Sequence, residues 1–177
     1  MLPLSALGQR IIILGPSNSG KSTLAVSIAR KQAMIAVHLD QLRHIPNTNW
    51  QERPDADFAQ LHNAAIQKDS WVMDGNYSSL MPQRVERATG LIALNSNVWL
   101  RYFRYVKRTL RNNEARAGHL EGGEDHLSWQ MTCWIMQTRN NGVRFARILQ
   151  NSGKPSVACN TAKELRALYK NWSLPAP

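Results

Sequence analysis

The sequence predicts a single α/β domain, residues 1–177, with a five-stranded parallel sheet and helices on both of its faces. Five short, largely aliphatic runs alternate with segments of helical periodicity, which is typical of buried parallel strands joined by helical crossovers. A glycine-rich loop lies between the first run and the first helical segment. The length suits one domain, and neither an internal repeat nor a shift in composition marks a second one.

The glycine-rich loop, Gly15-Pro16-Ser17-Asn18-Ser19-Gly20-Lys21-Ser22, fits G-x-x-x-x-G-K-[ST], the phosphate-binding P-loop or Walker A motif. Its glycines let the backbone turn N–H groups toward phosphate oxygens, and the start of the following helix adds a favourable potential for anions. Lys21 is expected to reach the β and γ phosphates, and the Ser22 hydroxyl to bind Mg²⁺. The predicted ATP-binding residues are Gly15, Ser17, Asn18, Ser19, Gly20, Lys21, Ser22 and Thr23.

The remaining elements follow from periodicity and from turn residues. Apolar runs predict strands at 10–14, 34–40, 71–77, 91–94 and 155–159. Helical spacing predicts helices at 21–32, 55–68, 97–113 and 128–150, a short one within 78–89, and a last one capped by Thr161. The core candidates of the helix at 128–150 are Met131, Trp134, Ile135, Phe145 and Leu149. Segments 41–54 and 114–125 are expected to be loops.

The helix expected at 97–113 has two faces. An apolar stripe is predicted to face the core and consists of Trp99, Phe103, Val106 and Leu110. A basic stripe without any acidic residue consists of Arg101, Arg104, Arg108 and Arg111. Both a solvated surface and a surface that faces an anion are compatible with this stripe. Because it leads into a glycine-containing connection, a short arginine-bearing lid is expected near 111–126.

Polar residues at the carboxyl ends of the predicted strands indicate a metal and acceptor site, because ligands of open parallel sheets bind there. Asp74 is predicted to hold Mg²⁺ together with Ser22, and a turn-forming Asp-Gly pair is the alternative. Asp40 is a candidate to bind the acceptor, assist the metal or act as general base, with a turn-capping role as the alternative. The residues predicted to take part in catalysis are Lys21, Asp40, Arg84, Arg104 and Arg108, from a pool of arginines that also holds Arg101, Arg111 and Arg116.

The composition limits the kinds of ligand and partner that the protein can have. The formal net charge is +10, which requires an anionic ligand or partner without choosing between nucleotide phosphates, nucleic acid and an acidic membrane surface. Two cysteines are too few for a disulfide framework, and residues 1–9 lack the pattern of a signal peptide. No apolar run approaches a membrane span, so no membrane partner and a cytoplasmic location are expected.

Asp74-Gly75-Asn76-Tyr77, which follows His38-Leu39-Asp40 and the P-loop, resembles the corresponding motif of the bacterial P-loop proteins known as DNA topology modulation proteins. These are related to adenylate kinases and shikimate kinases, and the resemblance extends to about Trp134. It implies a P-loop NTPase fold similar to that of nucleoside monophosphate and shikimate kinases. Arg84 is similar to the acceptor arginine of adenylate kinases, and Arg101, Arg104 and Arg108 are similar to the arginines that lead into their lid.

Two positions depart from these families. The fourth strand usually ends Leu-Asp in the family, whereas this sequence has Leu94-Asn95 and therefore lacks that carboxylate. Adenylate kinases continue Asp-Gly-Phe-Pro, whereas Asn76 and Tyr77 follow Asp74-Gly75 here, so AMP is not assumed to be the acceptor.

The sequence therefore predicts an ATP-binding P-loop kinase that transfers the γ-phosphoryl group to a small acceptor, a nucleotide or a small metabolite, with Mg²⁺. Two alternatives stay open: a regulator of DNA topology that binds nucleic acid and uses ATP as a switch, and a nucleotide-binding protein with little catalysis. Nucleic acid is not favoured as a partner, because no helix-turn-helix, zinc module or RNA-binding aromatic motif is present. The oligomeric state is not predicted.

Overall fold

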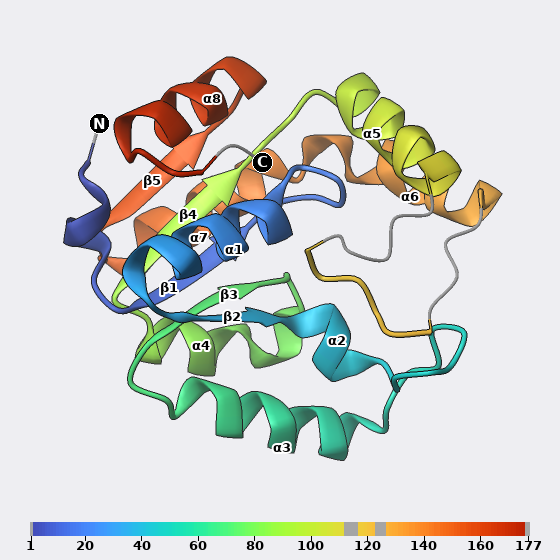
Figure 1. Cartoon of the computed structure of the whole chain (residues 1–177), viewed down its shortest axis with the longest axis horizontal. Helices are drawn as coiled ribbons and strands as arrows, with labels where there is room; N and C mark the ends of the chain where they lie inside the picture. Colours follow the sequence, from blue (N-terminus) through green and yellow to red (C-terminus); the bar gives the residue numbers. More distant parts are fainter. Residues whose placement is uncertain (1, 112–116, 123–126, 176–177) are drawn as a thin grey trace.

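The computed structural model describes residues 2–111, 117–122 and 127–175. Its centre is a five-stranded parallel sheet in the order β2-β3-β1-β4-β5 (Figure 1). The strands are β1 (Arg10–Leu14), β2 (Ile35–His38), β3 (Trp71–Asp74), β4 (Gly90–Leu94) and β5 (Ser156–Cys159). This confirms the predicted α/β class with a five-stranded parallel sheet.

Helices cover both faces of the sheet, as predicted (Figure 1). The face that packs α1 (Lys21–Gln32) and α8 (Ala162–Asn171) contains Ile11 and Ile13. The opposite face contains Ile12 and Leu14 and packs α3 (Asp55–Ile66), α4 (Met81–Arg87) and α7 (Gly142–Ser152). Alternate residues of β1 thus enter two separate cores, which explains why the whole strand is apolar.

The strand order places the candidate site. β1 lies between β3 and β4, so the connections of the sheet diverge at the carboxyl end of β1. In parallel sheets of this kind, ligands bind at the point where the strand order reverses. The P-loop leaves the sheet there, and Asp74 ends the neighbouring strand β3.

Several element boundaries differ from the prediction. The second strand ends at His38, and α2 (Leu39–Arg43) begins where strand and loop were expected. The helix expected at 128–150 is divided into α6 (Trp129–Gln137), the 3₁₀ helix η3 (Thr138–Asn140) and α7. The hydrogen bonds of Thr138 account for this division. Its hydroxyl donates to the Trp134 carbonyl, and its carbonyl accepts a hydrogen bond from the Arg101 side chain as well as from the backbone. Two further 3₁₀ helices are η1 (Leu4–Leu7) and η2 (Ser78–Leu80).

The predicted core face of the helix at 97–113 is wrong. In α5 (Val98–Arg111), the side chains of Trp99, Phe103 and Leu110 are 68%, 62% and 72% exposed. Arg101 and Tyr105 are buried instead. The reason is that α5 packs against the P-loop and α6 rather than on the sheet, so its inner face is the one that donates hydrogen bonds. Trp134 was also expected in the core and is 52% exposed.

Candidate active site

The P-loop has the backbone that its glycines require. Gly15 has φ 152° and Gly20 has φ 99°, both in a region that other residues rarely adopt. A Cβ on Gly15 would lie 2.5 Å from the carbonyl oxygen of Leu94, so no larger residue fits beside β4. Gly20 is the N-cap of α1, and Lys21 begins this helix. The helix N-terminus therefore opens into the loop, as an anion site requires.

Two arginines of α5 hold the loop from outside. Arg101 Nε donates to the Ser17 carbonyl at 2.9 Å, and Arg104 donates to the Ser19 carbonyl at 3.2 Å. In a trans peptide the N–H points opposite to the preceding carbonyl. Carbonyls drawn toward α5 therefore turn the N–H groups of Asn18 and Gly20 to the other side, which is where phosphate oxygens would bind.

Lys21 lies in this arrangement with its Nζ donating to the Pro16 carbonyl at 3.0 Å. Burial lowers its pKa, and the charges of Asp74 and Asp40 oppose that change. A buried ammonium group without a bound anion is poorly solvated, which favours binding of a phosphate.

A second group of side chains joins the ends of β2 and β3. The Ser22 hydroxyl donates to Asp74 Oδ2 at 2.6 Å, and His38 Nδ1 lies 2.5 Å from Asp74 Oδ1. His38 and Asp74 are register partners at the ends of these strands, and both are buried. Sequence reasoning missed His38, although its position directly before Leu39-Asp40 at a strand end was the available signal.

The Ser22–Asp74 pair fits Mg²⁺. This ion takes oxygen ligands and keeps several waters, so one carboxylate and one hydroxyl beside a phosphate cradle form a suitable donor set. Among the described residues, no group of three or more His, Cys, Asp or Glu side chains could hold a metal ion. The site therefore fits an ion held by Ser22, Asp74 and phosphate oxygens rather than a cage of protein ligands.

Asp40 lies in the first turn of α2 and is exposed. Tyr77 donates its hydroxyl to Asp40 Oδ1 at 2.7 Å. Burial and the neighbouring Asp40 raise the pKa of Tyr77, so its hydroxyl stays protonated and continues to donate. Asp40 is thus an oriented carboxylate that follows β2, at the opposite edge of the sheet from β5, the strand that leads to α8.

Arg84 differs from the other predicted catalytic residues because it lies inside the protein. Its side chain is 0% exposed, and it donates to the carbonyls of Gly75, Asn76 and Tyr77. Burial lowers its pKa to about 10. Asn76 in turn pairs with the backbone of Gly15 through both atoms of its amide. The Gly75–Tyr77 loop, fixed by Arg84, therefore supports the start of the P-loop.

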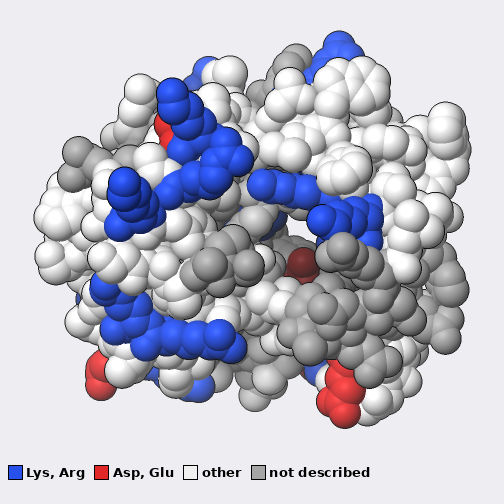
Figure 2. Space-filling model, turned by 45° about the horizontal axis from the view of Figure 1, so that its top comes forward, with Lys and Arg blue, Asp and Glu red and all other residues white. Residues whose placement is uncertain are grey.

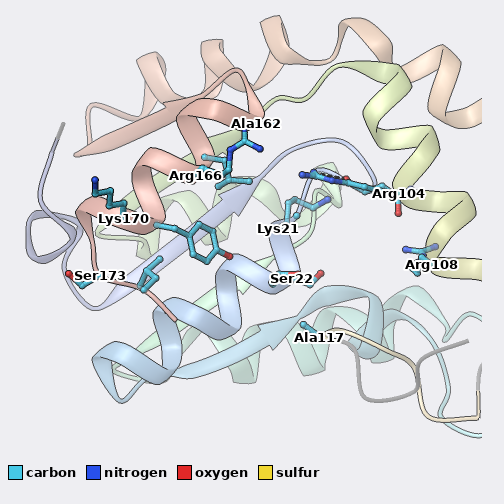
Figure 3. A pocket seen from close by; sticks show the side chains of 15 residues that line it. Lys21, Ser22, Arg104, Arg108, Ala117, Ala162, Arg166, Lys170 and Ser173 are labelled. Atoms are coloured by element: carbon cyan, nitrogen blue, oxygen red, sulfur yellow. Dashed lines mark hydrogen bonds between the residues drawn. The ribbon is translucent and has the colours of Figure 1, made fainter. Parts of the chain in front are cut away.

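A pocket of about 780 Å³ opens from the P-loop toward α8 (Figure 3). Arg104 and Arg108 enter it from α5, and Arg166 and Lys170 border it from α8. The residues of the P-loop and α1 that line it are Asn18, Gly20, Lys21, Ser22 and Thr23. Burial, and then the charge of Arg166, lower the pKa of Arg104. The pocket therefore brings cations from distant segments together, which suits a polyanionic ligand.

Sequence reasoning missed the residues of α8, because only the placement of β5 beside β4 brings them to the P-loop. Segment 117–122 covers the other side of the site: a Cβ on Gly118 would lie 3.2 Å from Ser22 Oγ and 3.3 Å from His38 Nδ1. Figure 2 shows a hollow with basic side chains along its rim and an acidic side chain deep inside. Of the lid predicted near 111–126, the structure describes 117–122. The Arg111 side chain, residues 112–116 with Arg116, and residues 123–126 lie outside the described residues.

No family model and no curated protein matches the sequence. Solved structures do match. Shikimate kinase from Acinetobacter baumannii, in complex with shikimate, has a TM-score of 0.52 at 13% identity, covering 93% of each chain. Shikimate kinase from Bacteroides thetaiotaomicron has a TM-score of 0.53 at 16% identity, covering 94% of this chain and 99% of that one.

A putative kinase from Chloroflexus aurantiacus has a TM-score of 0.57 at 16% identity, covering 90% of this chain and 94% of that one. These likenesses establish that the chain has the fold of P-loop kinases of the shikimate kinase type. The resemblance to DNA topology modulation proteins stays a prediction.

Within the described residues, no helix is both long and apolar enough to cross a membrane.

Proposed function

We propose that the protein is a kinase that transfers the γ-phosphoryl group of ATP to a hydroxyl group of a small acceptor. The observation that carries this proposal is the hydrogen bond between Ser22 of the P-loop and the Asp74 carboxylate at the end of β3. Asp40, an exposed carboxylate that Tyr77 holds, follows β2 and is not among the described residues that line the cationic pocket. A phosphate cradle, a metal-binding pair and an oriented base are the parts that phosphoryl transfer requires.

ATP would lie with its phosphates at the N-terminus of α1 and its nucleoside in the pocket toward α8. Lys21, Arg104 and Arg108 supply positive charge to the phosphates, and Leu165 and Tyr169 offer apolar surface to the nucleoside. Ser22 and Asp74 would hold Mg²⁺, which when bound neutralises charge on the β and γ phosphates. His38 keeps the Asp74 carboxylate in place for this task.

The transfer step then proceeds on the Asp40 side. The acceptor hydroxyl oxygen forms a bond to the γ-phosphorus, and the bond from that phosphorus to the bridging oxygen of ADP breaks. ADP leaves with the electron pair of the broken bond. Asp40 accepts the hydroxyl proton, and Tyr77 holds the carboxylate in a fixed orientation for it.

The arginine stripe bears on the nucleic-acid alternative. Arg101 is buried, and both Arg101 and Arg104 donate to carbonyls of the P-loop. These two members of the stripe are therefore turned toward the nucleotide site, which supports phosphate binding more than a DNA surface.

An ATP-consumption screen tests the proposal. Purified protein, ATP and Mg²⁺ are combined with a panel of alcohols, sugars, nucleosides and nucleotides, and ADP formation is measured. We expect ADP formation that depends on one class of acceptor and is lost in Lys21→Ala. ADP formation at the same low rate with every compound, or with Lys21→Ala as with the parent, contradicts the proposal.

A further inference from the structure

We infer that the acceptor is an uncharged polyhydroxy compound, a sugar or a polyol, without a phosphate or carboxylate group. This inference rests on the proposed function and names the class of its second substrate. It departs from what the resemblance of Arg84 to an acceptor arginine implies. It is based on the hydrogen-bond and ion-pair partners of the described charged residues on the Asp40 side of the cleft.

The two terminal nitrogens of Arg84 donate to the protein itself, and its Nε is buried without a hydrogen-bond partner. Arg84 donates to Gly75 O at 3.2 Å, to Asn76 O at 2.8 Å and to Tyr77 O at 2.9 Å. An arginine that bound an acceptor anion would need donors facing the cleft, but the Arg84 side chain is 0% exposed. Withdrawing it would leave three loop carbonyls without this donor, which is costly inside a protein. Arg84 therefore positions the loop and does not bind the acceptor.

Other arginines on this side also donate to the protein. Arg43 donates to Glu52 and Asp55, both at 2.5 Å. Arg53 Nε donates to the Leu42 carbonyl at 3.1 Å. Further along the chain, Arg87 Nε donates to the Ile66 carbonyl, close to the amino edge of the sheet and away from the cleft. The described segments β2–α2 and β3–α4 therefore offer an acceptor anion little positive charge.

What this side does offer is an exposed carboxylate that can bind hydroxyl groups. Asp40 is an exposed carboxylate fixed by the Tyr77 hydroxyl. Gln41, the next residue, reaches the carbonyl of His119 in segment 117–122, which closes this side of the cleft. A carboxylate accepts hydrogen bonds from hydroxyl groups, and it repels a phosphate or carboxylate on the same ligand. An uncharged ligand with several hydroxyls satisfies Asp40 without bringing an unpaired negative charge beside it.

Matched pairs of acceptors test this inference. Each pair shares a carbon skeleton and differs in one charged group: glucose and gluconate, glycerol and glycerate, adenosine and AMP. The kcat/KM for ADP formation is measured for each compound with ATP and Mg²⁺. We expect the uncharged member of a productive pair to exceed the acid or phosphate member by at least about tenfold, because an unpaired charge is costly to bury.

Two variants separate the role of Arg84. Arg84→Lys cannot reach three carbonyls at once, so it should lower the melting temperature and reduce kcat/KM for all acceptors by the same factor. Arg87→Lys, at the far end of α4, is the matched control and should change neither. A selective loss of anionic acceptors in Arg84→Lys would instead identify Arg84 as an acceptor-binding residue and overturn the inference.

The outcomes of the acceptor panel are distinct. A preference for the acid or phosphate members overturns the inference and leaves the proposed kinase intact. If ATP is not consumed with any member of the panel, the proposed function is overturned, and the inference with it. A preference for the uncharged members supports both.

Discussion

The two sides of the cleft use arginine in different ways. On the nucleotide side, Arg104 and Arg108 enter a large pocket and face Arg166 across it, and none of the described residues that line it is acidic. On the Asp40 side, Arg43 is paired with two carboxylates and Arg84 is buried beneath a loop. Positive charge is thus available to a ligand on one side and is neutralised or enclosed on the other.

The number of basic residues is therefore a poor guide to where anions bind. A net charge of +10 predicts an anionic ligand, but the hydrogen-bond partners of each arginine decide which side of the site can hold it. In a phosphoryl transfer, the triphosphate needs compensation of its charge, whereas a hydroxyl acceptor needs a base and an unhindered approach.

The largest effect is expected on the nucleotide side for Lys21→Ala. Because Lys21 begins α1 at the phosphate cradle, its loss should reduce ATP turnover by at least about 10²–10³-fold while the melting temperature stays close to that of the parent. Steady-state ADP formation and a thermal melt measure both. Arg30→Ala, an exposed change on the same helix, is the control. Turnover equal to that of the parent would show that the P-loop lysine takes no part in the reaction.

On the Asp40 side, Asp40→Asn should lower kcat by about a hundredfold, since general-base catalysis contributes about 10²–10⁴-fold. The KM for ATP should hardly change, because Asp40 does not line the nucleotide pocket. Asp57→Asn, in the exposed first turn of α3, controls for the loss of one negative charge. A raised KM for ATP with an intact kcat would assign Asp40 to the nucleotide side instead.

Asp74→Asn tests the Ser22–Asp74 pair as the Mg²⁺ site between the two sides. Replacing the acceptor of the Ser22 hydrogen bond should weaken Mg²⁺-dependent nucleotide binding by about 1.5–3 kcal/mol and metal-free binding by much less. Titration of ATP with and without Mg²⁺ measures this, with the exposed Asp69→Asn as control. Equal losses in both titrations would make Asp74 a structural residue.

The double change Arg104→Ala and Arg108→Ala separates phosphoryl transfer from DNA binding. It should slow turnover at saturating ATP by about tenfold, because these cations act on phosphate charge in a confined site. Lys107→Ala, an exposed change on the same helix, should not. Unchanged turnover together with lost DNA binding would favour the nucleic-acid alternative.

The smallest effect is expected for Arg166→Ala at the far wall of the pocket. Arg166 is exposed, so its contribution to ATP binding should be a few-fold at most, or about 0.2–1 kcal/mol. Lys163→Ala, also on α8 but outside the pocket, is the matched control. Calorimetric titration compares the two variants. Identical affinities in Arg166→Ala, Lys163→Ala and the parent would restrict phosphate recognition to the P-loop and α5.

The central sheet and the P-loop could be predicted from the sequence because their signals are local. The apolar runs of β1 to β5 and the spacing from Gly15 to Ser22 are fixed by what a buried strand and a phosphate loop require. The Thr161 cap is local in the same sense, and its side chain accepts from the Glu164 amide as expected.

Features set by tertiary contacts could not be predicted. The periodicity of α5 identifies an apolar stripe, but the carbonyls of the P-loop attract Arg101 to the interior and leave Trp99 outside. Arg84 has the spacing of a ligand-binding residue, whereas its partners are backbone carbonyls that no sequence pattern displays. Arg166 joins the pocket only because β5 lies at the edge of the sheet beside β4.

The most direct test of the proposed phosphoryl transfer is ³¹P NMR of a reaction that contains ATP, Mg²⁺ and the best uncharged acceptor of the matched pairs. We expect ATP to disappear, ADP and one new phosphomonoester to appear in equal amounts, and Asp40→Asn to slow both together. Release of inorganic phosphate in place of the ester, or ATP that persists with every acceptor, would contradict it.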